Sequence, residues 1–200
     1  MKRSLLLPSL VLLVALVILL ASSAAGPPSA PPLAPVSVFF VRHAETASST
    51  RTNRDPELSA VGISRGHALA QLLKTCGATH LFASEFQRTQ STLAELAKVC
   101  GLEVTVIAAN DGEAQLATLR ALPAGAVAVV CGHSNTVPTM VAGLGGEIAD
   151  LKDLPAAQQV FAHDAYQRLI LVVLPATEAA AAKTIELRYG ADPVAAALAD

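Results

Sequence analysis

Two histidines of this chain each follow directly after a short apolar run. Residues 36–41 (VSVFFV) lead into Arg42 and His43, and residues 126–131 (AVAVVC) lead into a glycine and then His133. Six apolar residues that are rich in Val or Phe and end at polar or glycine residues are typical of a buried strand. Parallel strands open their carboxyl ends on the crevice where ligands bind, so we expect both imidazoles at the same level of one sheet. This placement favours catalysis over packing.

Arginines supply the second part of this chemistry. Arg42 precedes His43, and Arg88 lies at the start of a predicted helix, where the positive end of the helix dipole disfavours a cation. A bound anion explains an arginine at such a position. Ser134 begins the helix that follows His133, and free backbone N–H groups at a helix start also bind anions. Two guanidiniums, two imidazoles and these N–H donors therefore predict a pocket for a phosphate-like dianion.

The elements that position these residues alternate along the chain. Apolar runs predict strands, and segments with helical apolar spacing predict helices between them. The strands are predicted at residues 36–41, 79–83, 104–108, 126–131, 168–174 and 184–188, and the helices at residues 60–75, 88–99, 112–122 and 137–143. Alternation of this kind predicts an α/β fold with three layers, in which a mostly parallel central sheet carries helices on both faces.

Three sequence blocks resemble one family. They are RHAET at residues 42–46, SEFQRTQST at 84–92 and GHSNT at 132–136. Together and in this order they resemble the histidine phosphatase superfamily, which contains the cofactor-dependent phosphoglycerate mutases and many phosphatases. LSAVG at 58–62 and YQRL at 166–169 are also similar to the family pattern. The resemblance covers residues 36 to about 189 and implies a phosphoglycerate mutase-like fold in a small, exported, bacterial-type member.

The resemblance also implies a role for each residue of the predicted pocket. His43 would be the nucleophile that becomes a phosphohistidine, and Arg42, Arg88 and His133 would hold the phosphoryl oxygens, with Ser134 beside them. The physical chemistry agrees, because His43 must be neutral to attack and neighbouring arginines disfavour its protonation. We expect no metal and no other cofactor, since the guanidiniums supply the electrostatic stabilisation and the five histidines show no HExxH spacing.

The proton donor for the leaving group is less well defined. One branch of the family places an acid just after the second catalytic histidine, where this chain has no carboxylate. The other branch places it after the third strand, where Asp111 and Glu113 are the candidates and Asp111 is preferred. Asp111 is equally suited to cap the helix at residues 112–122. If neither carboxylate reaches the pocket, we expect substrates with good leaving groups, such as acyl phosphates or phosphoramidates.

Other polar residues near these motifs have plainer interpretations. Glu45 either lines the mouth of the pocket or is a solvated loop residue. Ser84 is expected to cap a helix rather than to act in catalysis. The segment at residues 47–57 forms either part of the substrate rim or an ordinary polar loop. His67, His80 and His163 are expected to be structural or solvated.

The amino-terminal residues predict export. Two basic residues precede an uninterrupted apolar stretch at residues 10–21, which is long enough for a signal peptide and too short to span a bilayer. We therefore divide the chain into a signal peptide or uncleaved anchor at 1–25, a proline-rich linker at 26–35, a histidine phosphatase domain at 36–190 and a tail at 191–200. The expected location is periplasmic or secreted. In such a compartment Cys76 and Cys100 either form a disulfide or remain two half-buried thiols.

Composition restricts the partners. The formal net charge is −2, charged residues make up 15% of the chain and Trp is absent, so nothing favours nucleic acid. The expected partner is a phosphorylated small molecule or phosphoprotein, and a membrane is expected only if the amino-terminal segment is retained.

Three other functions compete with phosphoryl hydrolysis. A serine hydrolase would use Ser134 in a G-x-S-x-G-like turn, with His163 and one of three aspartates, Asp150, Asp153 or Asp164. A binding module would hold phosphorylated ligands without turnover, and a mutase remains open within the family. A cysteine phosphatase is excluded, because the C-x5-R spacing does not occur.

Overall fold

The structure is a computed structural model that describes residues 34–50, 52–177 and 180–190. The predicted signal segment and tail lie outside the described residues, as does the predicted linker except for its last two residues. In the described part of the chain, no helix has the length and apolar character needed to cross a membrane.

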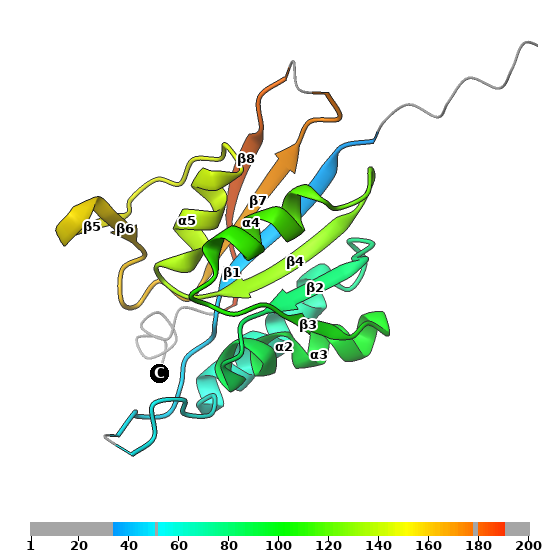
Figure 1. Cartoon of the computed structure of the whole chain (residues 1–200). Helices are drawn as coiled ribbons and strands as arrows, with labels where there is room; N and C mark the ends of the chain where they lie inside the picture. Colours follow the sequence, from blue (N-terminus) through cyan, green and yellow to red (C-terminus); the bar gives the residue numbers. More distant parts are fainter. Residues whose placement is uncertain (1–33, 51, 178–179, 191–200) are drawn as a thin grey trace, which may run out of the picture. The chain divides into compact units, whose positions relative to one another are not determined.

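A six-stranded sheet with the strand order β3-β2-β4-β1-β7-β8 forms the centre of the fold (Figure 1). The first four strands in this order pair in parallel, whereas β7 pairs antiparallel with both β1 and β8. The strands are β1 (Val36–Arg42), β2 (His80–Ala83), β3 (Val104–Val106), β4 (Val127–Gly132), β7 (Arg168–Leu174) and β8 (Lys183–Arg188). All six predicted strands are confirmed, with ends that differ by at most two residues.

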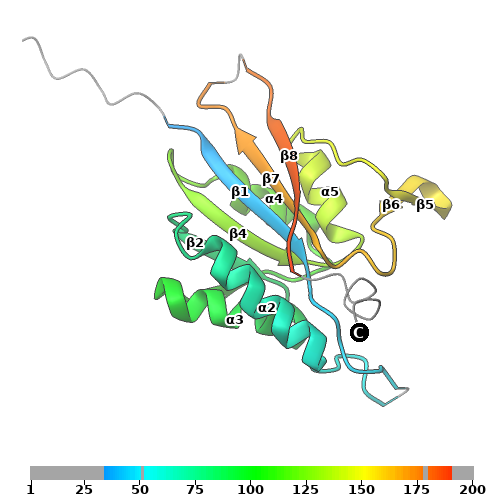
Figure 2. The same cartoon turned by 180° about the vertical axis from the view of Figure 1, so that it is seen from behind.

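Helices cover both faces of this sheet. The helices are α2 (Ala60–Leu73), α3 (Gln87–Cys100), α4 (Gly112–Arg120) and α5 (Thr136–Gly143). Figure 1 shows α4 and α5 in front of the strands, and Figure 2 shows α2 and α3 in front of them from the opposite side. The predicted three-layer fold is confirmed.

Alternate side chains of the strands enter two apolar cores. Val38 and Phe40 of β1 pack in the cluster that contains residues of α4 and α5. Val41, which points to the other face, packs with residues of α2 and α3. All three side chains have no exposed surface. The run VSVFFV is therefore continuous in its apolar character because both faces of the strand are buried.

The sequence patterns missed one small element, a two-stranded antiparallel ribbon of β5 (Lys152–Leu154) and β6 (Gln158–Val160). Its segments read KDL and QQV, and five of these six residues are exposed. An exposed ribbon buries too little apolar surface to impose the alternation by which strands are recognised.

The register of β1 and β4 brings the two histidines to the same level. Arg42 pairs with Gly132, and one residue later the His43 N–H donates to the Gly132 carbonyl oxygen at 2.9 Å. His43 and His133 are the residues that follow this pair. Their ring centroids lie 5.4 Å apart, as the strand-end argument predicts.

Candidate active site

An open pocket of about 590 Å³ lies at the carboxyl ends of the parallel strands. It is lined by residues from the loops after β1, β2, β3 and β4, namely His43, Glu85, Phe86, Arg88, Ala109, Asn110, His133, Ser134, Asn135 and Thr136. Four predicted site residues, His43, Arg88, His133 and Ser134, therefore share one pocket. Arg42, Asp111 and Glu113 are outside this lining.

The tautomer of His43 is fixed by the backbone. Its Nδ1 lies 2.9 Å from the carbonyl oxygen of Ala44, which can only accept a hydrogen bond, so Nδ1 carries the proton. In the neutral ring Nε2 then holds a lone pair. Burial, with the positive charges of Arg42 and Arg88, lowers the pKa of His43 to about 4 against the opposing effect of the Ala44 carbonyl. A pKa this far below neutrality leaves the ring of His43 uncharged at physiological pH.

His133 is fixed in the opposite way, by a side chain. Its Nε2 lies 2.9 Å from Ser84 Oγ, which lies 2.9 Å from Thr89 Oγ1. The Thr89 hydroxyl donates to backbone carbonyl oxygens, at 2.7 Å to Phe86 and 3.1 Å to Ser84. Thr89 therefore accepts from Ser84, and Ser84 accepts from His133 Nε2–H. Burial and the charge of Arg88 lower the pKa of His133 to about 4.

Ser84 does not cap α3, and that prediction is wrong. The residue at the start of the helix is Phe86, which makes no capping hydrogen bond through its side chain. Ser84 is instead 3% exposed and its hydroxyl lies between His133 and Thr89. The local sequence of a helix start resembles a cap, and only the tertiary contact with β4 reveals the other role.

Helix α3 also supports the backbone beside His43. The Ala44 N–H donates to Thr92 Oγ1 at 2.9 Å, and the Thr92 hydroxyl donates to the Arg88 carbonyl oxygen at 2.7 Å. Thr89 and Thr92 are both fully buried. The block SEFQRTQST thus contacts the surroundings of both histidines, through Ser84 before α3 and through Thr92 within it.

Arg42 lies behind the pocket and is held by the segment before β7. Its Nη1 donates to the carbonyl oxygens of Ala162 and His163, at 3.1 and 2.7 Å, and its Nη2 donates to the Tyr166 hydroxyl at 3.3 Å. The guanidinium also lies 4.1 Å from the centre of the Tyr166 ring. The Nε–H of Arg42 is buried without a partner in the described part of the chain. Burial lowers the pKa of this guanidinium.

Arg88 reaches the pocket from the first turn of α3. Its Nη1 donates to Asp55 Oδ1 at 3.0 Å, and the guanidinium lies 4.3 Å from the centre of the Phe86 ring. The other Asp55 oxygen accepts from the Gln87 N–H at 2.8 Å. The loop after β1 is therefore attached to the start of α3, beside the pocket, by Asp55. The sequence patterns gave no signal for this pair.

The predicted proton donors lie outside the pocket lining. Asp111 is the N-cap of α4, and its Oδ1 accepts from the Ala114 N–H at 2.9 Å, which confirms its predicted capping role. Glu113 lies in the first turn of the same helix with an exposed side chain. The lining contains one carboxylate, that of Glu85, which accepts from the Ala109 N–H at 2.8 Å.

Glu45 is neither at the pocket mouth nor solvated, so both predictions for it are wrong. Its oxygens accept from Arg65 Nη2 and Nε at 2.6 and 2.8 Å. Burial opposes ionisation, but the hydrogen bonds and charge of Arg65 lower the pKa of Glu45 below its ordinary value. Gly62 explains part of the LSAVG block, because a Cβ there would lie 2.0 Å from the Glu45 carbonyl oxygen. This contact packs the loop after β1 against α2.

Ser134 does not form a catalytic triad in the described structure. Its carbonyl oxygen accepts from the Phe161 N–H at 2.9 Å, and among the described residues its hydroxyl makes no hydrogen bond with a histidine. His163 is exposed. Cys76 and Cys100 are free thiols, both partly buried, and burial raises the pKa of Cys76.

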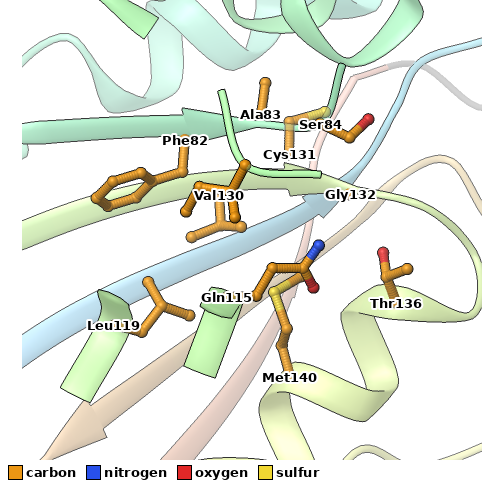
Figure 3. Close-up of a pocket in the computed structure, with 11 residues that line it drawn as sticks. Phe82, Ala83, Ser84, Gln115, Leu119, Val130, Cys131, Gly132, Thr136 and Met140 are labelled. Atoms are coloured by element: carbon orange, nitrogen blue, oxygen red, sulfur yellow. The ribbon is translucent and has the colours of Figure 1, made fainter. Parts of the chain in front are cut away.

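A second, narrower pocket lies under the ends of β2 and β4 (Figure 3). Apolar side chains such as Phe82, Leu119 and Met140 make up most of its lining, and Thr136 lies in both pockets. Neither His43 nor Arg88 lines this pocket, which lies among the apolar side chains of the core. Among the residues that the structure describes, no group of three or more His, Cys, Asp or Glu is arranged to hold a metal.

One known protein family matches part of this sequence. Residues 38–109 match the histidine phosphatase superfamily (branch 1). This match confirms the predicted resemblance over residues 38–109, which contain His43 and Arg88, while the predicted blocks at 132–136 and 166–169 lie beyond it. A relative named "Probable phosphoglycerate mutase GpmB", from Yersinia enterocolitica, is 38% identical over 73 residues, 34% of each chain. The chain thus aligns with about a third of the length of the curated relatives it matches.

Solved structures share the fold. The protein histidine phosphatase SixA complexed with tungstate superposes with a TM-score of 0.58 at 21% identity, over 76% of this chain and 96% of that one. A mycobacterial glucosyl-3-phosphoglycerate phosphatase gives a TM-score of 0.55 at 14% identity, over 78% and 99% of the two chains. At these identities the likeness establishes the three-layer fold.

Proposed function

We propose that this chain, which matches the histidine phosphatase superfamily (branch 1) over residues 38–109, belongs to that family and is a phosphatase that works through a phosphohistidine on His43. The main support is the tautomer and the protonation state of His43. Its Nδ1 proton is held by the Ala44 carbonyl oxygen at 2.9 Å, and its pKa is lowered to about 4. A neutral imidazole with Nε2 as the free lone pair is the form that can attack phosphorus.

The reaction would proceed in two transfers. In the first, Nε2 of His43 forms a bond to phosphorus as the bond to the leaving group breaks, and the leaving group takes up a proton. In the second, a water oxygen bonds to phosphorus, the P–N bond breaks, and its electron pair returns to Nε2. Phosphate is released and His43 is restored.

Cationic groups around His43 would stabilise the charge on the phosphoryl oxygens. Arg88 lines the pocket, and Arg42 precedes His43 in the chain and has a buried Nε–H without a partner among the described residues. Leaving a buried donor unpaired costs about 1–3 kcal/mol, so an oxygen acceptor within reach of this N–H would be bound favourably. His133 gains a proton on its free Nδ1 when a dianion binds, since an opposite charge favours the protonated ring. These groups supply the charge stabilisation that a metal provides in other phosphatases, and we propose a metal-independent reaction.

We propose a phosphomonoester, phosphohistidine or acyl phosphate as substrate, carried by a small molecule or a protein. The open pocket supports either carrier, because its rim is formed by loops at the end of the sheet rather than by a closed cavity. The proteins of similar fold include a protein histidine phosphatase and a glucosyl-3-phosphoglycerate phosphatase, so both carriers are represented among them.

The test is hydrolysis of nitrophenyl phosphate by the full chain in the presence of a chelator. We expect turnover, an acid-labile phosphoenzyme, and loss of both in His43→Ala. Turnover that survives His43→Ala, or that is lost in Ser134→Ala alone, would contradict the proposal and favour a serine hydrolase. Stabilisation by phosphate without turnover would identify a binding module instead.

We also propose that the protein is exported and loses its amino-terminal segment. The support is the basic start and the apolar stretch at residues 10–21. Mass spectrometry of the chain from an exporting host should find a mature amino terminus near residue 26. An intact Met1 in that material would indicate a retained anchor.

A further inference from the structure

The pocket lacks a predicted proton donor, and the carboxylates near it are almost all engaged elsewhere. Asp111 caps α4, Glu45 is paired with Arg65, and Asp55 is paired with Arg88. Each accepts hydrogen bonds from a helix terminus or a guanidinium, so moving one into the pocket would break these contacts. Glu85 is the carboxylate left among the residues that line the pocket.

The carboxylate of Glu85 is held beside the pocket by one described backbone contact. Its Oε2 accepts from the Ala109 N–H at 2.8 Å, which joins the loop after β2 to the segment after β3. Among the described hydrogen bonds, none engages Oε1. Glu85 lines the same pocket as His43 and His133, and its negative charge raises the pKa of His133 against the effect of burial. Oε1 is thus a free oxygen on an anchored side chain at the pocket.

We propose that Glu85 is the general base and general acid of the reaction, a role that rests on the proposed phosphohistidine mechanism. Oε1 takes a proton from the attacking water as the water oxygen bonds to phosphorus and the P–Nε2 bond of phosphorylated His43 breaks. The electron pair of that bond remains on Nε2. In the next cycle Glu85 returns the same proton to the leaving oxygen of a phosphomonoester. Over one turnover Glu85 therefore neither gains nor loses a proton.

This assignment has a consequence for the substrate. Phosphomonoesters of alcohols need a proton at the leaving oxygen, whereas nitrophenolate and acyl leaving groups depart without one. With Glu85 in this role the enzyme hydrolyses alkyl phosphates and is not confined to substrates with good leaving groups. The position of Glu85 on the rim also leaves room for the leaving group to face solvent.

The experiment is rapid quenching of the full chain with ³²P-labelled nitrophenyl phosphate, which separates formation of the phosphoenzyme from its hydrolysis. Glu85→Gln retains an oxygen for the Ala109 N–H and removes only the titratable group. We expect it to form phosphoenzyme at nearly the wild-type rate and to hydrolyse it about 10²-fold more slowly, so that phosphoenzyme accumulates. Added formate should restore hydrolysis in Glu85→Ala.

Glu103→Gln is the matched control, because Glu103 is exposed and lies outside the pocket lining. Wild-type hydrolysis of the phosphoenzyme in Glu85→Gln would overturn the assignment, as would accumulation in Asp111→Asn instead. Absence of any phosphoenzyme in the wild-type chain would overturn the proposed function itself. A phosphoenzyme that forms and decays at wild-type rates in Glu85→Gln would leave the proposed function intact and overturn only the role of Glu85.

Discussion

The ends of β1 and β4 present the same residue type in two different states. His43 carries its proton on Nδ1, because Nδ1 faces the Ala44 carbonyl oxygen. His133 carries its proton on Nε2, because Nε2 faces the Ser84 hydroxyl, whose own proton is donated to Thr89. Burial lowers the pKa of both rings to about 4. Two neutral imidazoles with ring centroids 5.4 Å apart therefore have opposite tautomers.

The two histidines also differ in the source of the hydrogen bond that fixes each ring. The partner of His43 is the backbone of the next residue, which no substitution removes, and the lone pair that remains on Nε2 suits a nucleophile. The partner of His133 is the side chain of Ser84, so its tautomer depends on a contact between two loops. A ring held in this way can accept a second proton on Nδ1 when an anion binds, which suits a phosphate clamp.

The largest predicted effect on kcat distinguishes His43, the proposed nucleophile, from His133, the proposed phosphate clamp. We expect His43→Ala to abolish the phosphoenzyme and lower kcat by roughly 10⁴-fold or more, as loss of a nucleophile does in other covalent enzymes. His133→Ala removes one charge-stabilising group and should lower kcat by about 10²–10³-fold while a phosphoenzyme still forms. Steady-state kinetics and phosphoenzyme trapping on both variants measure the difference. Equal losses, with no phosphoenzyme in either variant, would remove the distinction between the two ends.

The sequence predicts the strand ends but not the contacts between them. The runs before His43 and His133 identify both histidines because an apolar strand and its polar end are local features. The pairs Ser84–His133, Asp55–Arg88 and Glu45–Arg65 join residues 49, 33 and 20 positions apart. No periodicity along the chain encodes such a pair, since it depends on how the loops meet after folding. Local patterns consequently located the pocket and misassigned the residues that support it.

The shifted pKa values give the next prediction. Both rings should titrate near pH 4 in the free protein, more than two units below an ordinary imidazole, which is over 100-fold in proton affinity. Because the unfolded rings take up protons at higher pH than the folded ones, the free energy of unfolding should fall as pH falls from about 6.5 to 4. NMR titration of the imidazole resonances measures each ring.

Titration in the presence of inorganic phosphate tests whether His133 contacts a bound anion. A bound dianion stabilises the protonated ring of the clamp, so the pKa of His133 should rise when inorganic phosphate is added. A variant that lacks the positive charge of Arg88, such as Arg88→Met, should also raise the pKa of His133, because that charge is a cause of its lowering. If phosphate leaves the titration of His133 unchanged, His133 does not contact the anion.

Removal of the Ser84 hydroxyl should affect one histidine and spare the other. In Ser84→Ala the Nε2–H of His133 loses its acceptor, whereas the contact between His43 and the Ala44 carbonyl oxygen is untouched. Supporting contacts of this kind typically contribute 10-fold or more to a site, and we expect kcat to fall about 10-fold. Ser84→Thr, which keeps a hydroxyl, is the matched variant and should recover part of the loss. An equal effect of both variants would indicate disturbed packing of this buried residue.

The smallest predicted effect on kinetics is that of Asp55→Asn. This variant tests whether Asp55 orients Arg88 toward the pocket. Asp55→Asn keeps an oxygen for the Gln87 N–H but removes the charge that faces Arg88 at 3.0 Å. Partly exposed ion pairs contribute about 0.2–1 kcal/mol, so if Asp55 orients the guanidinium toward the pocket, KM should rise about 2- to 5-fold with kcat nearly unchanged. Glu95→Gln, which removes a partly exposed ion pair with Lys98 on the same helix, is the control. A fall in KM would instead mean that Asp55 competes with the substrate for Arg88, and the β1 loop would then oppose anion binding rather than prepare for it.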